Sequence, residues 1–172
     1  MQLTVTEAVV LGLLADDERS GYDLLKRIEG SVGYMWAPAR SQLYAVLPRL
    51  VRGGLARRRV VRQSDRPDKQ LYRATAAGRE AFRRWLDEAE ARTEDELLLK
   101  VFFGRHASPE ALRDQLERYR ADQKARLAEY AAIEREIAAD PASRHGYLTL
   151  RYGIALQRTR LRWLGEALRE LG

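Results

Sequence analysis

Arginine offers the most evident chemistry in this chain of 172 residues, because one stretch gathers much of the positive charge. From Arg49 to Arg79 there are ten Lys or Arg residues and two Asp, which gives the segment a net charge of +8. The whole chain carries +6, so the remaining residues sum to −2. A concentrated basic segment is what a phosphate backbone attracts. Charge alone is a weak motif, since the solvated face of an arginine-rich protein has the same composition.

Side chains that serve in catalysis or metal binding are scarce. There is no cysteine, and the two histidines, His106 and His145, stand at apparent helix boundaries, where simple surface exposure explains them. Neither has a second histidine at the short helical spacing of a metal site, and no Gly-rich phosphate loop or nucleophile elbow is present. We therefore expect no enzyme, no cofactor and no metal, although catalytic groups that converge from distant positions keep an enzyme as an alternative.

A helix is expected to carry the start of the basic stretch. Pro38 suits a first helical position, and Gly53-Gly54 suits the end of the helix. Apolar residues recur between them at helical spacing, namely Leu43, Val46, Leu47 and Leu50. The opposite face has polar, basic and small residues and no carboxylate, as a helix that reads base edges in a major groove requires.

A β-hairpin is expected to follow this helix and two capped helices to precede it. Residues 55–62 are rich in Arg and Val, residues 63–69 form a turn cluster with Pro and Asp, and residues 70–74 return as a short strand. Capping sequences at residues 4–7 and 20–23 start the two earlier helices. Three helices and a hairpin in this order predict a winged helix-turn-helix with its wing tip near residues 65–69.

The rest of the chain is predicted to be helical. Helices are expected from Ala76 to about Ala91, over residues 97–103, from Ser108-Pro109 to about Ala139, and from Ala142 to Leu171. We place a domain boundary after residue 91, which gives a winged helix-turn-helix domain at 1–91 and a helical domain at 92–172. The expected fold class is mainly α, with an N-terminal winged helix-turn-helix, a small β-hairpin wing and a C-terminal helical dimerisation domain.

The last helix has two apolar stripes and therefore needs two partners. One stripe follows the a and d positions of a heptad, and Leu148, Tyr152, Leu156 and Trp163 form the other. The preceding long helix can cover one stripe, and a second copy of the chain is expected to cover the other. A monomer that folds both stripes inward is the alternative. The predicted dimer interface consists of Tyr147, Leu150, Ile154, Leu161, Leu164 and Leu168.

No segment of the sequence predicts contact with a membrane. The longest apolar run, residues 8–15, is too short to span a bilayer, and the N-terminus lacks the pattern of a signal peptide. We expect a cytoplasmic protein.

Several segments resemble the PadR family of bacterial transcriptional regulators in its longer-tailed form. They are residues 11–15, 20–24, 43–44 with Leu47 and Leu50, 54–55, 72–78, 96–100, 102–103, the helix from Ser108-Pro109, and Trp163. Pro48 departs from the family pattern, where a long polar residue is expected, and its ring should weaken the bond to the Tyr44 carbonyl and bend the helix. The resemblance implies a dimeric repressor that binds operator DNA and is released by a small molecule, often an aromatic or planar one.

The predicted contacts with double-stranded DNA come from three places. Side chains near the start of the third helix contact bases or adjacent phosphates, the start of the second helix anchors the backbone, and the wing reaches the neighbouring groove. Solvent exposure alone is the alternative for Gln42, and partly buried packing is the alternative for Tyr44. The predicted DNA-binding residues are Tyr22, Arg40, Ser41, Gln42, Tyr44, Arg49, Arg66 and Lys69. Two-fold symmetry of a dimer predicts an inverted-repeat operator.

Two rival interpretations involve other binding proteins. A winged-helix adaptor would bind another protein through its hairpin and helical arm, but the concentrated basic charge argues against it. A MarR-like regulator would take its dimer helices from both ends of the chain. Here the first helix begins close to Met1, and the long helices are all C-terminal.

Overall fold

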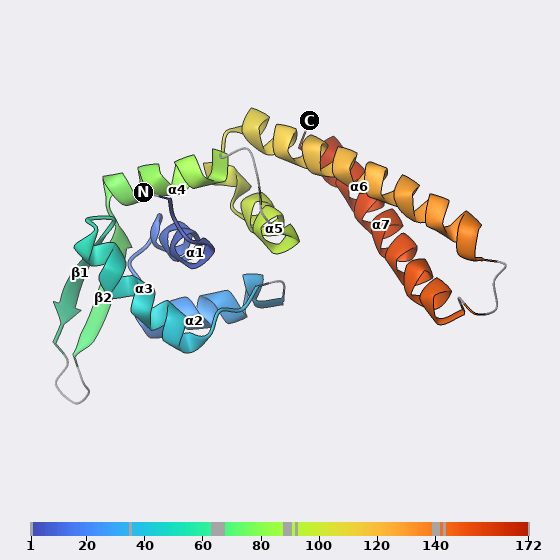
Figure 1. The fold of residues 1–172 in the computed structure, drawn as a ribbon. Coiled ribbons are helices and arrows are strands. Elements are labelled where there is room, and N and C mark those ends of the chain that lie inside the picture. Colours follow the sequence, from blue (N-terminus) through green and yellow to red (C-terminus); the bar gives the residue numbers. More distant parts are fainter. Residues whose placement is uncertain are drawn as a thin grey trace. The chain divides into compact units, whose positions relative to one another are not determined.

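The computed structural model describes residues 2–34, 36–62, 68–87, 91, 93–138, 142 and 144–171. The chain divides into two compact units, Met1–Ser108 and Pro109–Gly172 (Figure 1). The order of helices and the two-stranded hairpin confirm the predicted fold class, mainly α with a small β-hairpin wing. The dimerisation expected of the C-terminal helices stays a prediction. The compact units divide later in the chain than the boundary expected after residue 91, because the helix Glu94–Phe102 and the turn that follows it belong to the first unit.

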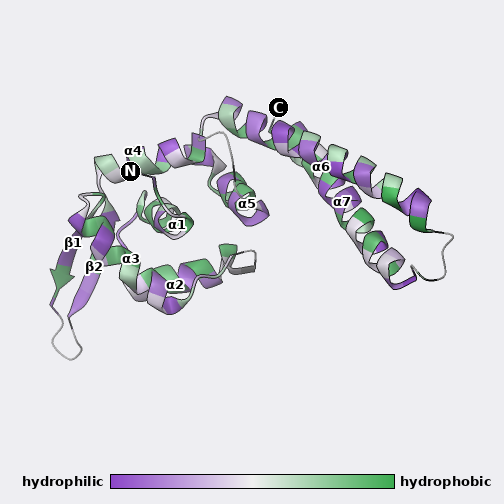
Figure 2. Cartoon of the chain, viewed as in Figure 1, coloured by the Kyte–Doolittle hydropathy of each residue, from purple (hydrophilic) through white to green (hydrophobic). Residues whose placement is uncertain are grey.

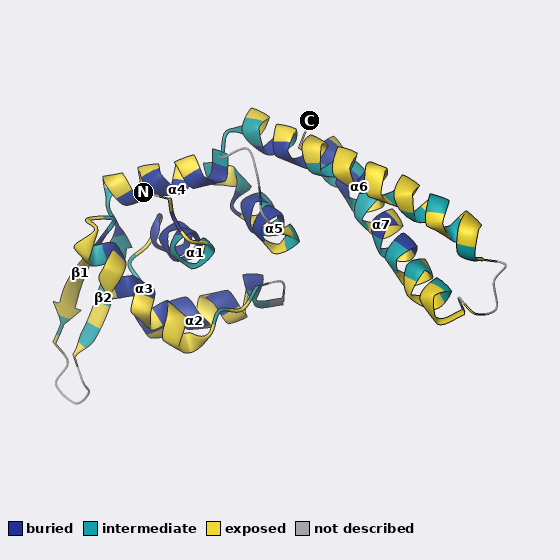
Figure 3. Ribbon diagram, viewed as in Figure 1, coloured by how far each residue is buried: buried dark blue, intermediate teal, exposed yellow. Residues whose placement is uncertain are grey.

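Helix α1 (Val5–Leu14) lies at the centre of the first unit, where Figure 3 shows it mostly buried. Every residue from Ala8 to Leu14 is buried, and the helix contacts α3, α4 and β2. The predicted capping box is confirmed: the Thr4 hydroxyl accepts from the Glu7 N–H, and the Glu7 carboxylate accepts from the Thr4 N–H at 2.9 Å. Because residues 8–14 of this central helix are apolar or glycine and buried on every side, the other elements of the unit pack around it.

Helices α2 (Gly21–Glu29) and α3 (Arg40–Arg52) form the helix-turn-helix, with a short 3₁₀ turn η1 (Val32–Tyr34) between them. The α2 capping box is confirmed as well. The prediction that Pro38 starts α3 is wrong, because Ala39 has an extended backbone and serves as the N-cap. Helix α3 continues through Pro48 to Arg52, and Gly54 then takes a left-handed φ of +69°, which suits a glycine after a helix end.

Strands β1 (Ala56–Val61) and β2 (Lys69–Ala74) pair antiparallel, from Ala56 opposite Ala74 to Val61 opposite Lys69. Arg19 joins β2 through a β-bridge to Tyr72, with backbone hydrogen bonds of 2.9 and 2.8 Å. The connection between α1 and α2 is thereby fixed against the wing. The Gln63–Pro67 part of the expected turn lies outside the described residues.

Helix α4 (Ala76–Asp87) packs closely on the turn before β1. A Cβ at Gly78 would lie 1.9 Å from the Leu55 carbonyl oxygen, so only glycine fits there. Helix α5 (Glu94–Phe102) and the 3₁₀ turn η2 (Gly104–His106) complete the unit. On α5, Phe102 is exposed, whereas the charged Lys100 is fully buried, with its Nζ 5.1 Å from the centre of the Trp85 ring.

The second unit consists of α6 (Pro109–Ile137) and α7 (Arg144–Glu170), which pack against each other. Figure 2 shows hydrophobic and hydrophilic residues alternating along both helices. The buried residues are Leu112, Gln115, Leu116 and Gln123 of α6 with Ile154, Gln157, Leu164 and Leu168 of α7. Within the part of the chain that the structure describes, no helix is both long and apolar enough to cross a bilayer.

Candidate nucleic-acid interface

The outward face of α3 carries most of the predicted DNA contacts. Leu43, Val46, Leu47 and Leu50 are buried on the inner face, as predicted. The predicted contacts on this helix are all exposed, namely Arg40, Ser41, Gln42, Tyr44 and Arg49. A helix that is anchored by four apolar side chains and presents amide, hydroxyl and guanidinium groups outward has the chemistry needed to read base edges.

The sequence left two expectations open for Tyr44, a DNA contact or partly buried packing. Its side chain is both partly packed and partly exposed, so it is compatible with either. Its side chain is 49% exposed. Its ring also lies against the start of α2, where a Cβ on Gly21 would meet Tyr44 Cε1 at 2.6 Å. The glycine therefore lets the tyrosine ring lie close to the α2 N-terminus.

The start of α2 and the end of the hairpin contribute further predicted contacts. Tyr22 is 58% exposed, and Lys26 Nζ lies 5.0 Å from the centre of its ring. A groove of about 460 Å³ brings together residues of α2, α3 and β2, and its lining includes Tyr22, Tyr44 and Lys69. Arg40 and Arg49 do not line this groove. The predicted contact Arg66 lies outside the described residues.

Carboxylates from neighbouring elements pair with the predicted phosphate contacts, which the sequence did not indicate. Lys69 Nζ lies 3.0 Å from Asp23 Oδ2. Arg49 pairs with Glu7 at 3.8 Å, and Arg40 pairs with Glu29 at 3.7 Å. Such partly exposed ion pairs contribute only about 0–1 kcal/mol each, so a DNA phosphate can replace the carboxylate.

Asp23 holds the start of α2 and the wing together. Its Oδ2 accepts from the Ser20 hydroxyl at 2.7 Å, from the Ser20 N–H at 3.2 Å and from Lys69 Nζ at 3.0 Å. The hydrogen bond from the Ser20 side chain, followed by that from Lys69, lowers the pKa of Asp23 below its usual value. The capping pattern revealed the first of these partners, but only the folded chain brings Lys69 to the same oxygen.

Glu18 is a second acidic residue that sequence reasoning missed. Its carboxylate accepts from Arg59 Nε at 2.8 Å and lies 3.8 Å from Arg57. The hydrogen bond from Arg59 is the main reason why the pKa of Glu18 is lowered, and the charges of Arg57 and Arg73 act in the same direction. Arg57 and Arg59 themselves stand exposed on β1 and were not among the predicted contacts, although the run of arginines was the available signal.

The predicted dimer residues divide into two groups. Ile154, Leu164 and Leu168 are buried within the second unit of a single chain. Tyr147, Leu150 and Leu161 are partly exposed. Leu148 and Tyr152 of the other stripe are 57% and 71% exposed, so this stripe is the more open of the two.

Two family models match separate parts of the chain. The transcriptional regulator PadR-like family model matches residues 10–84, and the virulence activator alpha C-terminal model matches residues 93–172. The two matched segments are separated by residues 85–92, an interval that includes the domain boundary expected after residue 91. The compact units instead divide after Ser108. The expected boundary therefore stays a prediction.

Curated relatives match over nearly their full length. A probable transcriptional regulator of Mycobacterium tuberculosis, Rv1176c, is 30% identical over 175 residues, covering 91% of this chain and 92% of the relative. The negative transcriptional regulator PadR of Bacillus subtilis is 27% identical over 177 residues, covering 96% and 97%. The crystal structure of Bacillus subtilis PadR in complex with operator DNA is 26% identical with a TM-score of 0.50, covering 95% and 98%. With the winged helix in the matched N-terminal segment, these similarities show that the chain belongs to the PadR family of transcriptional regulators.

Proposed function

We propose that this protein is a homodimeric repressor that binds an inverted-repeat operator and is released by a small-molecule effector. The observation that carries the proposal is the exposed face of α3, which presents Arg40, Ser41, Gln42 and Arg49 without a carboxylate of its own. The related Bacillus subtilis protein was crystallised with operator DNA, which supports the same class of partner here.

In the proposed complex, α3 enters the major groove. Arg40, Ser41 and Gln42 lie in its first turn and are assigned to base edges or adjacent phosphates. Tyr44 and Tyr22 line the groove of the protein surface between α2, α3 and β2. This groove lies next to the α2 N-terminus, where backbone N–H groups favour a phosphate. Arg49 and Lys69 are assigned to the DNA backbone, and so is Arg66.

The ion pairs at the edge of this surface make binding an exchange of partners. Asp23, Glu7 and Glu29 hold Lys69, Arg49 and Arg40 before DNA arrives. A phosphate then takes the place of each carboxylate. Such an exchange keeps the cations in position and gives binding the salt dependence of counterion release.

Dimerisation is assigned to the exposed apolar side chains of α7. Leu148 and Tyr152 stand open to solvent, and Tyr147, Leu150 and Leu161 are partly exposed. Exposed apolar stripes on soluble proteins commonly mark interaction surfaces. A two-fold axis through this interface would give two winged helices and therefore two half-sites.

Repression in this scheme is competition for a promoter. A dimer on an operator that overlaps the promoter excludes the polymerase. The effector is proposed to be a small aromatic or planar compound. It releases the dimer from DNA only if its affinity is higher for the dimer arrangement that cannot bind DNA than for the arrangement that can.

Fluorescence anisotropy tests the proposal directly. The purified full chain is titrated against labelled duplex from immediately upstream of its own gene and against a shuffled duplex, over a series of salt concentrations. Salt-sensitive binding with a clear preference for the native duplex supports a specific regulator. Equal, weak binding to both duplexes contradicts specific recognition of that site, and absence of binding at low salt favours the protein-binding adaptor.

A further inference from the structure

One face of the wing carries four basic side chains, and only Lys69 among them is a predicted DNA contact. Successive side chains of a strand point to opposite faces of a sheet. The antiparallel register of β1 and β2 therefore places these four on the same face, namely Arg57, Arg59, Lys69 and Arg73. Arg59 lies two residues along β1 from Val61, the partner of Lys69, which is about 7 Å along the strand. This basic face of the wing continues the surface that is assigned to DNA.

Glu18 holds two of these cations with one carboxylate. Its Oε2 accepts from Arg59 Nε at 2.8 Å and lies 2.7 Å from a terminal nitrogen of the same guanidinium. Its Oε1 lies 3.8 Å from a terminal nitrogen of Arg57. Guanidinium groups bind carboxylate and phosphate oxygens with the same forked geometry. The Glu18 carboxylate therefore occupies the place that a phosphate would take.

The two arginines are open to solvent, whereas the carboxylate is mostly covered. The side chains of Arg57 and Arg59 are 66% and 58% exposed, and that of Glu18 is 22% exposed. A phosphate can therefore approach both guanidinium groups from solvent. Arg73 has no ion pair with a described residue and donates to the Asp16 carbonyl at 3.5 Å. The basic face thus stays net positive with Glu18 in place.

The backbone fixes Glu18 in this position. The next residue, Arg19, exchanges backbone hydrogen bonds of 2.9 and 2.8 Å with Tyr72 of β2. Glu18 is therefore held beside the hairpin before DNA arrives. The hydrogen bond from Arg59 lowers the pKa of Glu18, so its carboxylate is charged near pH 7 and competes with other anions.

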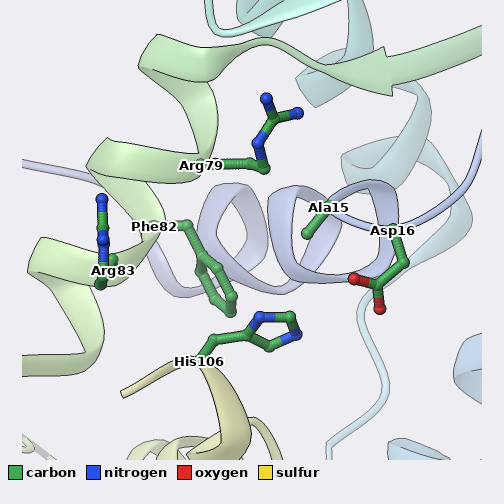
Figure 4. A pocket seen from close by; sticks show the side chains of 6 residues that line it. All are labelled: Ala15, Asp16, Arg79, Phe82, Arg83 and His106. Carbon is green, nitrogen blue, oxygen red and sulfur yellow. The ribbon is translucent and has the colours of Figure 1, made fainter. Parts of the chain in front are cut away.

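The other two carboxylates of the α1–α2 connection have different partners. Asp16 lines a pocket between α1, α4 and η2 (Figure 4), and its carboxylate pairs with Arg105 of η2. Asp17 pairs with Arg19 at 3.0 Å. Among the ion pairs of the described residues, Glu18 is thus the one acidic residue of this connection that pairs with the basic face of the wing.

We propose that Glu18 limits the affinity of this protein for DNA by competing with backbone phosphates for Arg57 and Arg59. The inference rests on the proposed DNA binding, to which it adds two phosphate contacts and the residue that opposes them. DNA either displaces the Glu18 carboxylate or binds without the two arginines, and each course costs affinity. Because phosphates carry no sequence information, the loss is the same for every duplex.

The effect of Glu18→Gln on DNA binding tests the inference. Glutamine keeps the size of the side chain and removes its charge, so Arg57 and Arg59 become available to phosphates. Anisotropy of the full chain on a shuffled duplex, over a salt series, measures the change. Near physiological salt the variant is expected to bind at least about fivefold more tightly, and the slope of log affinity against log salt should steepen by about one to two units.

Asp17→Asn is the matched control. It removes the same charge from the neighbouring residue, whose partner is Arg19 and not an arginine of the wing. A general gain from lower negative charge would be the same in both variants. We expect the affinity of Asp17→Asn to stay within about twofold of the parent.

Arg59→Gln, made in the parent and in Glu18→Gln, identifies the cation that Glu18 withholds. In the parent, where Glu18 holds Arg59, the substitution should cost at most about twofold in affinity. In Glu18→Gln, where Arg59 is released, it should cost at least about fivefold. Circular dichroism of each variant shows that the fold is intact.

Three results would overturn the inference. They are an unchanged affinity of Glu18→Gln, an equal gain in Asp17→Asn, and equal losses from Arg59→Gln in the two backgrounds. The preference of the parent for its native duplex over the shuffled one tests operator recognition separately, since the variants are compared on the shuffled duplex. A parent that binds DNA while the variants do not differ contradicts this inference alone, and absence of binding by every variant at low salt contradicts both proposals.

Discussion

The two compact units bury their apolar side chains to different degrees. The first has one continuous core that joins α1 to α2, α3, the hairpin, α4 and the end of α5. The second has only the contact between α6 and α7, and buried Gln123 and Gln157 interrupt its apolar row. A pair of helices shares a single interface, and Leu148 and Tyr152 of α7 stay exposed among the described residues of this unit. The first unit buries its apolar side chains within one chain, and the proposed dimer would bury those that the second unit leaves exposed.

The largest expected effect comes from Gly78, where the first unit is most tightly packed. Gly78→Ala places a Cβ 1.9 Å from the Leu55 carbonyl oxygen, and that atom belongs to the backbone. Either α4 or the turn before β1 must move, so we expect a loss of about 3 kcal/mol or more in the free energy of unfolding. Chemical denaturation followed by circular dichroism measures the loss.

The matched control is Gly146→Ala in α7 of the second unit. An added Cβ at Gly146 meets nothing within 4 Å. The free energy of unfolding should rise or stay within about 1 kcal/mol of the parent, because alanine favours helices more than glycine does. Similar losses in both variants would contradict the contrast in packing between the two units.

The second prediction concerns the exposed stripe of α7. Replacing both Leu148 and Tyr152 with Glu puts two charges into the proposed dimer interface. We expect the dimer to weaken by about 3 kcal/mol or more, roughly a hundredfold. Light scattering coupled to size-exclusion chromatography gives the mass at several protein concentrations.

Thr159→Glu, at an exposed polar position of the same helix, is the control and should leave the dimer intact. In the double variant the first unit should unfold at the same temperature as in the parent, because its core does not include these side chains. If the double variant stays dimeric, the second copy covers another surface of the chain.

Local sequence signals explain why so much of the first unit was predictable. The capping boxes at Thr4 and Ser20 join residues three positions apart, and such pairs are readable because a helix alone brings them together. Helical spacing likewise identified the buried face of α3, and with it the face that is exposed to solvent. The start of α3 was not predicted correctly from Pro38, since proline also fits the segment that precedes a helix.

Contacts between distant residues explain what the sequence did not reveal. Glu18 and Arg59 lie 41 positions apart, and the bridge between Arg19 and Tyr72 is what brings them together. The burial of Lys100 beside Trp85 likewise depends on packing between α4 and α5. On α7 the heptad correctly marked an apolar row, but Ile154 and Leu164 are already buried within a single chain. Periodicity shows that a row is apolar without showing which helix covers it.

Lys69→Ala tests whether DNA binding depends on charges of the first unit. Lys69 is assigned to a phosphate, so its loss should weaken binding to all duplexes alike, by about tenfold, and lower the slope of log affinity against log salt by about one unit. Arg158→Ala removes one exposed charge from α7 and should leave that slope unchanged. Anisotropy over a salt series measures both, and an unchanged slope for Lys69→Ala removes this residue from the phosphate contacts.

The smallest effect is expected from Glu18, which links the α1–α2 connection to the wing. Because Arg59 lowers the pKa of Glu18 in the folded chain, this carboxylate stabilises the fold above its unfolded pKa of about 4.3. That stabilisation is lost as the pH falls through the lower, folded pKa. Glu18→Gln should therefore lower the unfolding temperature slightly near pH 7 and match the parent near pH 2, where Glu18 is protonated in both states.

Glu166→Gln removes a charge from the second unit and serves as the control, with unfolding temperature measured by circular dichroism across the pH range. Glu166 lies at an exposed position of α7, where no ion pair with a described residue is found. If the two variants differ from the parent by the same amount at every pH, the effect is one of net charge. If only Glu18→Gln reaches the parent's unfolding temperature in acid, the effect comes from the pair with Arg59. Part of the acid sensitivity of the fold then arises in the unit that carries the proposed DNA contacts.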